Sequence, residues 1–341
     1  MLDKDRLYEF KDLVDKSQRV LVLQPDVEQV DPDSIRSALA IGGLLEGQGR
    51  DVTYYLSGEM PKVFQIIPGA EKFTQEFPEQ YDMSILVDCG GPAGQMAETI
   101  ARFSRAFEEN PFVIIDHHAN RKPAPFSTLD LVDEQAIATA EPIWEMAQEF
   151  GWPVTAKVAE DMIWSILSDS AMLALCERWE IVALLGELAR ISQISVREFY
   201  ARDQEIRRLP FEIFQKKVEL LGKIEFYLDG RVAIIFISKE VENAFKKEEL
   251  DGPGHLLRPE MREIRGVELQ VTLTENKDGS YRASARSSDE TGLAAKLAGH
   301  FGGGGHAGAA GFMVKGKSQG ELRSEIIQMA EEILGNRSRS K

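Results

Sequence analysis

The chain has 341 residues, which favours two domains, and its 43% hydrophobic and 28% charged residues are typical of a globular protein with a sizeable core. A net charge of −16 argues against tight binding of long duplex nucleic acid, because that affinity comes from many Lys/Arg–phosphate contacts, but leaves room for a small anionic substrate. No apolar run approaches the ~20 residues of a membrane span, and the N-terminus does not resemble a signal peptide. Two cysteines provide no disulfide framework. We therefore expect a cytoplasmic protein without membrane contacts.

The first part of the chain alternates apolar runs with helical patterns. We predict helices over residues 1–16, 33–46 and 95–108, and strands over residues 20–23, 52–56, 84–88, 112–116 and 129–132. This alternation is typical of an α/β domain with a doubly wound, mostly parallel sheet. Residues 138–217 have a helical pattern that Pro210 interrupts.

The pattern changes after residue 222. Asp229-Gly230 and Asp278-Gly279 each separate two apolar runs, which predicts two β-hairpins. A helix, a strand and a final helix follow, so we expect a smaller α+β domain with a mainly antiparallel sheet. The predicted organisation is an N-terminal domain over 1–195, a helical linker over 196–222 and a second domain over 223–336.

Acidic residues and histidines follow several predicted strands. The candidates are Asp31 and Asp33 after the first strand, Asp88 at the end of the strand over 84–88, Asp116, His117 and His118 at the end of the next strand, and Asp169 after a helical stretch. Because the carboxyl ends of parallel strands meet at one sheet edge, where open α/β sheets bind ligands, we expect most of these side chains to converge. Each of them alone is commonly a turn or capping residue.

A metal site fits this set of side chains. Carboxylate oxygens with one or two imidazoles suit Mn²⁺ or Mg²⁺ better than Zn²⁺, because the chain offers no set of thiolates. A bridging carboxylate such as Asp88 would hold two ions about 3.5–4 Å apart, an arrangement that activates water for in-line attack on phosphorus. Spacing alone leaves both the metal site and purely structural roles open.

Two motifs carry a family resemblance. Residues 116–119 read Asp-His-His-Ala, and Arg286-Ser287 is followed by a glycine-rich run over 301–311. The first motif resembles the signature of the DHH phosphoesterase family, and the second resembles the hallmark of the DHH-associated domain that accompanies it. Both occur in the family's order and spacing, so the resemblance covers nearly the whole chain. The two-domain form is most similar to the bacterial nanoRNases, which also dephosphorylate 3′-phosphoadenosine 5′-phosphate.

The resemblance implies a role for each candidate. The implied metal ligands are Asp31, Asp33, Asp88 as the bridging residue, His117 and Asp169. His118 would contact the scissile phosphate, and Asp116 would orient the two histidines. The implied substrate-binding residues are Arg286, Ser287, Gly303, Gly304, Gly305 and His306, with a bidentate arginine contact and glycine amides arranged as an anion-binding nest. The implied cofactor is Mn²⁺, as one or two ions, with Mg²⁺ as the alternative.

The sequence departs from the family pattern in three places. The spacing of the family's first histidine falls on Val27, and no histidine occurs over residues 24–30. The candidates for a substitute oxygen ligand are Gln24, Asp26 and Glu28. In the other two places, Arg36 replaces a glycine beside the expected site, and Ser170-Ala171 replaces Thr-Gly.

The expected function is that of a Mn²⁺-dependent phosphodiesterase or phosphatase. Its substrate would be short RNA or a small nucleotide such as 3′-phosphoadenosine 5′-phosphate. The alternative is a catalytically weakened relative that binds nucleotides as a sensor or scaffold. The missing histidine favours the alternative, whereas the five other ligand positions favour the enzyme. A homodimer is an expectation from the resemblance only.

Overall fold

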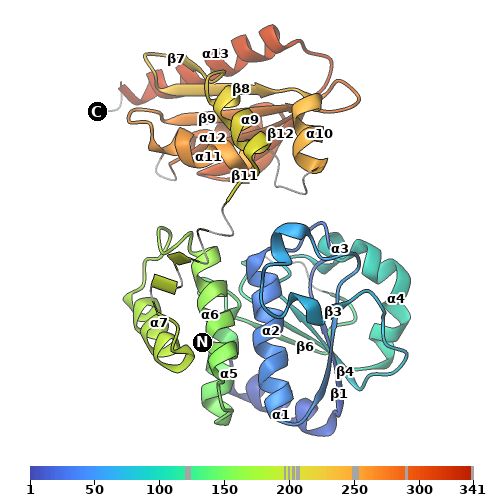
Figure 1. The fold of residues 1–341 in the computed structure, drawn as a ribbon. Helices are drawn as coiled ribbons and strands as arrows, with labels where there is room; N and C mark the ends of the chain where they lie inside the picture. Colours follow the sequence, from blue (N-terminus) through green and yellow to red (C-terminus); the bar gives the residue numbers. More distant parts are fainter. Residues whose placement is uncertain are drawn as a thin grey trace. The chain divides into compact units, whose positions relative to one another are not determined.

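The chain folds into two compact units, residues 1–206 and 207–341 (Figure 1). The computed structural model describes residues 1–119, 124–195, 197–198, 200–201, 204, 208–247, 253–288 and 291–338. Each unit has its own six-stranded sheet and its own hydrophobic core. Among the described residues, no helix is both long and apolar enough to cross a membrane.

The first unit is built around a parallel sheet. Its strands are β1 (Arg19–Leu23), β2 (Asp51–Tyr55), β3 (Phe73–Thr74), β4 (Met83–Val87), β5 (Phe112–Asp116) and β6 (Leu129–Val132). Its helices are α1 (Lys4–Lys16), α2 (Pro32–Gly47), α3 (Pro92–Gln95), α4 (Ala97–Glu109), α5 (Ala140–Phe150), α6 (Ala156–Asp169) and α7 (Trp179–Ser192), with short 3₁₀ helices over Lys62–Phe64 and Ala70–Lys72.

The strand order of this sheet creates a switch point. The order is β3-β2-β1-β4-β5-β6, and every neighbouring pair is parallel. The chain builds outward from β1 in one direction and then returns to β4 and builds in the other. In such sheets the loops at the carboxyl ends of the two central strands diverge and leave a crevice for a ligand. The loops that follow β1 and β4 therefore frame the expected site.

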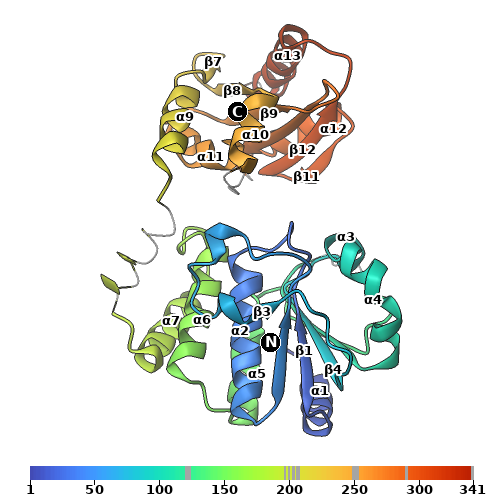
Figure 2. The same cartoon turned by 45° about the vertical axis from the view of Figure 1, so that its right-hand side comes forward.

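Helices cover both faces of the parallel sheet (Figure 2). Val20, Val22 and Ile85 pack in a cluster with residues of α1, α2, α5 and α6. Leu21 and Leu23 point to the opposite face, where an aromatic cluster includes Phe107 of α4. Successive strand residues thus alternate between two buried faces, which explains why β1, β4 and β5 are apolar over most of their length.

The second unit holds a mainly antiparallel sheet. Its elements are α9 (Phe211–Leu221), β7 (Glu225–Tyr227), β8 (Val232–Ile237), α10 (Lys239–Lys247), α11 (Pro253–Glu263), β9 (Leu269–Glu275), β10 (Tyr281–Ser287), α12 (Leu293–His300), β11 (Gly304–His306), β12 (Ala309–Val314) and α13 (Gln319–Ser338). The strand order is β11-β12-β10-β9-β8-β7, and only the β8–β9 pair is parallel. Helices α12 and α13 cover one face, whereas α9 and α11 cover the other.

The predicted fold class is confirmed, including the β7–β8 and β9–β10 hairpins. The structure adds α10, α11 and β11, which the sequence analysis did not predict. Helix α9 lies within the segment expected to link the domains, and its Ile213 and Leu220 pack in the core of the second unit.

Candidate functional site

Four segments bring acids and histidines to one edge of the parallel sheet. Asp31 and Asp33 lie at the start of α2, which follows β1. Asp88 follows β4, and Asp116, His117 and His118 end or follow β5. Asp169 is the last residue of α6. Two groups of three among them present ligand atoms within 4.8 Å of one another, namely Asp88-His117-His118 and Asp33-His117-Asp169.

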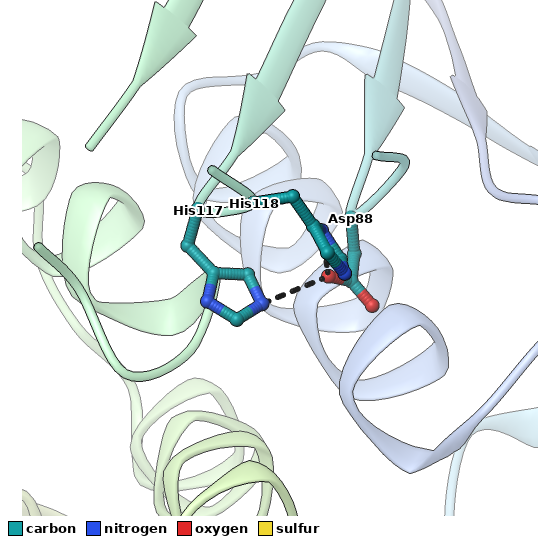
Figure 3. Close-up of side chains that lie close together, drawn as sticks. All are labelled: Asp88, His117 and His118. Carbon is teal, nitrogen blue, oxygen red and sulfur yellow. Dashed lines mark ion pairs between the residues drawn. The ribbon is translucent and has the colours of Figure 1, made fainter. Parts of the chain in front are cut away.

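His117 is common to both groups. Its Nε2 lies 3.1 Å from Oδ2 of Asp169, 3.4 Å from Oδ1 of Asp88 and 3.8 Å from Oδ2 of Asp33. Figure 3 shows His117 and His118 at the end of β5 with Asp88 beside them at the end of the neighbouring strand. His117 therefore lies at the centre of the acidic cluster.

The surroundings of His117 fit a divalent cation. Nδ1 lies 3.3 Å from the carbonyl oxygen of Ala136, and a proton on Nδ1 would leave a lone pair on Nε2. Nε2 is buried and has no well-aligned hydrogen-bond partner in the part of the chain that the structure describes. A bare lone pair among three carboxylates is unfavourable unless a proton or a metal cation lies between them. Carboxylates with imidazole are a donor set suited to Mn²⁺ or Mg²⁺.

The electrostatics of the cluster agree with this need for a cation. Burial lowers the pKa of His117, but the carboxylates of Asp169, Asp88 and Asp33 outweigh it and raise the pKa to about 11. Burial, and next the charge of Asp88, holds the pKa of Asp33 well above its usual range. Desolvation, and next the charge of Asp88, raises the pKa of Asp31 to about 7. The carboxylates thus repel one another strongly, and a bound cation would relieve that repulsion.

Asp33 is held in place by hydroxyl and amide donors. Its carboxylate is fully buried and accepts hydrogen bonds from Ser37 Oγ (2.8 Å), from Ser165 Oγ and from the backbone N–H of Thr139 (3.0 Å). The Thr139 hydroxyl donates to Oδ1 of Asp88 over 3.1 Å. Thr139 therefore links the two acids. The sequence analysis missed Thr139, Ser37 and Ser165; the one available signal was the position of Thr139 at the start of a helical pattern.

Two more acids have defined positions. Asp31 is the N-cap of α2, and its Oδ1 accepts the backbone N–H of Ser34 over 2.9 Å. Asp88 has a left-handed backbone with φ of 55°, a conformation that aspartate tolerates better than most residues. Its turn directs the carboxylate toward His117 and His118 (Figure 3).

Asp116 fixes His118. Its Oδ1 lies 2.8 Å from Nδ1 of His118 and accepts the backbone N–H groups of His117 (2.8 Å) and His118 (3.2 Å). Hydrogen bonding to Asp116 is the main reason that the pKa of His118 is raised. A Cβ atom on Gly90 would lie 3.1 Å from Cγ of His118, so the loop after β4 also confines the ring.

Arg36, which stands where the family has glycine, forms a buried ion pair with Asp161 of α6. Its Nη1 lies 2.6 Å from Oδ1 of Asp161, and both side chains are almost fully buried. The guanidinium also lies over the ring of Trp164. Helices α2 and α6 pack through this ion pair, so replacement of the family glycine here is a feature of helix packing.

In the second unit, Arg286 and His306 project from the same face of the sheet. Both pair with Ala309 of β12, one from β10 and the other from β11. Paired residues on neighbouring strands point to the same side, and strand spacing places their Cα atoms about 10 Å apart. Nη1 of Arg286 donates to Ser284 Oγ (3.0 Å) and to the carbonyl of Ala285 (2.8 Å).

Part of the glycine-rich run forms strand β11. Residues 304–306 pair with β12 at the edge of the sheet. Glycine is required at 303 and 305, because a Cβ atom would lie 2.2 Å from the Gly311 carbonyl oxygen and 2.5 Å from that of Ala309, respectively. Close backbone packing explains these two glycines, whereas a Cβ on Gly304 would meet nothing. Ser287 Oγ accepts the backbone N–H of Ala294 at the start of α12.

Comparison with protein families agrees with both motifs. Residues 27–174 match the model of the DHH family N-terminal domain, and residues 257–336 match that of the DHHA1 domain. The chain belongs to the DHH phosphoesterase family. The resemblance stated from the sequence is confirmed.

Three known proteins align with this DHH protein over most of its length. The bifunctional oligoribonuclease and PAP phosphatase NrnA of Thermus thermophilus is 24% identical over 311 residues, which cover 89% of this chain and 88% of that protein. The crystal structure of an exopolyphosphatase-related protein from Bacteroides fragilis has a TM-score of 0.79 at 19% identity, covering 98% of this chain and 97% of the other. A putative family II inorganic pyrophosphatase of Methanococcus jannaschii aligns with a TM-score of 0.44 at 17% identity, covering 92% and 99%.

Proposed function

We propose that this DHH protein is a Mn²⁺-dependent phosphoesterase that hydrolyses short oligonucleotides, small nucleotides such as 3′-phosphoadenosine 5′-phosphate, or both. The observation that carries the proposal is the cluster around His117, in which acids from three further segments surround one imidazole. The activities in the name of the Thermus thermophilus relative support the substrate class. The family supports dependence on a metal.

The residues around His117 would hold the ions. Asp33, His117 and Asp169 form one ligand group, and Asp88 would connect it to a second position near Asp31. Bound divalent ions would polarise the substrate phosphate and lower the pKa of a nucleophilic water. Asp33 would need no reorganisation, because Thr139, Ser37 and Ser165 already fix its oxygens.

His118 would act on the substrate. Asp116 holds Nδ1 and so turns Nε2 of the same ring away from Asp116. Hydrogen bonding to Asp116 raises the pKa of His118 and so favours the protonated ring. A protonated ring would stabilise negative charge on the phosphate or donate a proton to the leaving oxygen.

The second unit would bind a phosphate of a nucleotide. Arg286, Ser287, His306 and the glycines at 303–305 would form that contact, and the shared face of Arg286 and His306 supports it. Arg286→Lys and His306→Ala are expected to raise KM for a 5′-phosphorylated dinucleotide at least about tenfold with a smaller change in kcat. The matched control is Arg282→Ala, on the same strand and bonded to Glu242. An unchanged KM in both variants would overturn this role.

A substrate panel tests the proposed function. Wild-type protein with Mn²⁺ is expected to turn over a 5′-phosphorylated dinucleotide or 3′-phosphoadenosine 5′-phosphate far faster than a long duplex. A second candidate function is nucleotide binding without efficient catalysis, which the absence of a histidine over residues 24–30 favours. Micromolar binding of the dinucleotide without Mn²⁺-dependent turnover would select that candidate and overturn the first.

A further inference from the structure

Gln24 is a buried amide at the carboxyl end of β1. The residue follows Leu23, the last residue of the strand, and is only 3% exposed. Neither Oε1 nor Nε2 of its carboxamide is hydrogen-bonded to any residue that the structure describes. A buried amide without a partner is costly, and such groups commonly mark a place where a ligand or ion completes the contacts.

Strand β1 places Gln24 at the sheet edge where the acidic cluster lies. Side chains of β1 alternate, so Gln24 continues the face of Val20 and Val22, which α2 covers. The same face carries the start of α2, where Asp33 lies. Leu23 pairs with Leu86 of β4, and continuing that register sets Gln24 one residue before the level of Asp88. Gln24 thus lies on the face that α2 covers, which carries Asp33, and at the sheet edge where Asp88 follows β4.

The other candidates for a substitute ligand are hydrogen-bonded elsewhere or exposed to solvent. The carboxylate of Asp26 accepts the backbone N–H groups of Glu98 (2.8 Å) and Thr99 (3.2 Å) and the Thr99 hydroxyl, so it serves the start of α4. Glu28 is exposed. Val27 packs against the loop at Gly58, where a Cβ would lie 2.7 Å from Val27 Cγ1.

We propose that Oε1 of Gln24 is the metal ligand that replaces the family's first histidine. This inference rests on the proposed function, because it requires the divalent ion at the cluster. A carboxamide is neutral, like imidazole, and so leaves the charge of the acidic cluster unchanged. Its oxygen is a harder donor than an imidazole nitrogen, so the exchange favours Mn²⁺ and Mg²⁺ over Co²⁺ and Zn²⁺.

The test is Mn²⁺ binding by isothermal titration calorimetry, without substrate. Gln24→Leu, which keeps the approximate volume and removes the amide, is expected to weaken the tightest Mn²⁺ site at least about tenfold. Gln24→Glu is expected to restore it. Gln24→His is expected to restore binding and to raise the affinity for Co²⁺ relative to Mn²⁺. Asp26→Asn serves as the control and is expected to leave Mn²⁺ affinity within twofold of wild type.

Thermal unfolding of the metal-free protein separates a ligand from a structural amide. Gln24→Leu removes a buried polar group without a partner, so Tm without metal should stay unchanged or rise by a few degrees. A fall in Tm together with unchanged Mn²⁺ affinity would overturn the inference and leave the proposed function intact. If wild type fails to bind Mn²⁺ at all, or Asp88→Ala does not weaken binding, the proposed metal site itself is wrong.

Discussion

The Nδ1 atom of His118 lies 2.8 Å from Oδ1 of Asp116, and that same oxygen accepts the backbone N–H of His118. One carboxylate therefore fixes both the ring and the backbone of this histidine. Asp116 is completely buried, so its charge interacts with the two histidines and not with solvent.

Asp116→Asn tests this positioning role. The variant keeps an oxygen that can accept the backbone N–H groups but loses the charge that orients His118, so kcat should fall about 10–100-fold. Steady-state kinetics with a 5′-phosphorylated dinucleotide would measure the loss, and circular dichroism would show a retained fold. Asp51→Asn, on an exposed acid at the start of β2, is the matched control. A kcat within twofold of wild type would contradict the role of Asp116.

Ala171→Gly should stabilise the protein. Ala171 has φ of 49° and follows the acid of α6, where the family pattern has glycine. A left-handed conformation costs an alanine roughly 1–2 kcal/mol, and glycine loses part of that gain through the entropy of the unfolded chain. We expect a net increase of about 0.5–1 kcal/mol in the free energy of unfolding. Chemical denaturation would detect it, and a decrease would refute the strain at this position.

The buried Arg36–Asp161 pair should matter for stability and not for catalysis. Asp161→Asn leaves the Arg36 guanidinium buried without its carboxylate partner, so the free energy of unfolding should fall by about 3–5 kcal/mol. The double variant Arg36→Leu/Asp161→Leu removes both charges and should lose much less. Urea denaturation measures both values, and kcat per folded molecule should be unchanged. A double variant as unstable as the single one would exclude charge burial as the cause.

The ion pair of Asp82 and Arg19 should govern part of the acid stability. Hydrogen bonding from Arg19 lowers the pKa of Asp82 to about 2 in the folded state, whereas an unfolded aspartate titrates near about 3.9. The pair therefore stabilises the fold fully above about pH 4, and its contribution is lost as pH falls from about 4 to about 2.

Asp82→Asn checks this pH window. The difference in free energy of unfolding between wild type and variant should be largest near pH 6 and should shrink between pH 4 and pH 2. A difference that stays constant over this range would show that Asp82 has an ordinary pKa in the fold. Asp82 precedes β4, at the edge of the sheet opposite the acidic cluster, so kcat should be unchanged.

Local sequence patterns were sufficient to predict most of the fold. The strand over 129–132 is observed with those bounds, because its apolar and polar residues alternate between turn signals. Asp229-Gly230 lies in the turn over residues 228–231 between the paired strands β7 and β8, where Leu228, Asp229 and Gly230 all have positive φ. Strand β11 was not predictable, because a run of glycines lacks strand propensity and pairs only through its close fit to β12.

The positions of the site residues were predictable only where the topology of the sheet determines them. Parallel strands must bring Asp33, Asp88 and His117 to one edge, and the structure places them there. Contacts between separate helices are different, because they depend on how the helices pack. The bonds of Thr139 and Ser165 to Asp33 join residues more than 100 positions apart, and no local pattern indicates them. The same holds for Arg36, whose partner Asp161 lies on another helix.

The most direct test of the central claim is Mn²⁺-dependent turnover of a 5′-phosphorylated dinucleotide by wild type, Asp88→Ala and the control Asp51→Ala. Asp88 lies 3.4 Å from Nε2 of His117 and would connect the two metal positions. We predict turnover by wild type and by Asp51→Ala that stops when Mn²⁺ is chelated, and a loss of at least about 10³-fold in Asp88→Ala. Turnover by Asp88→Ala at the wild-type rate, or turnover that persists without divalent ions, would contradict the claim.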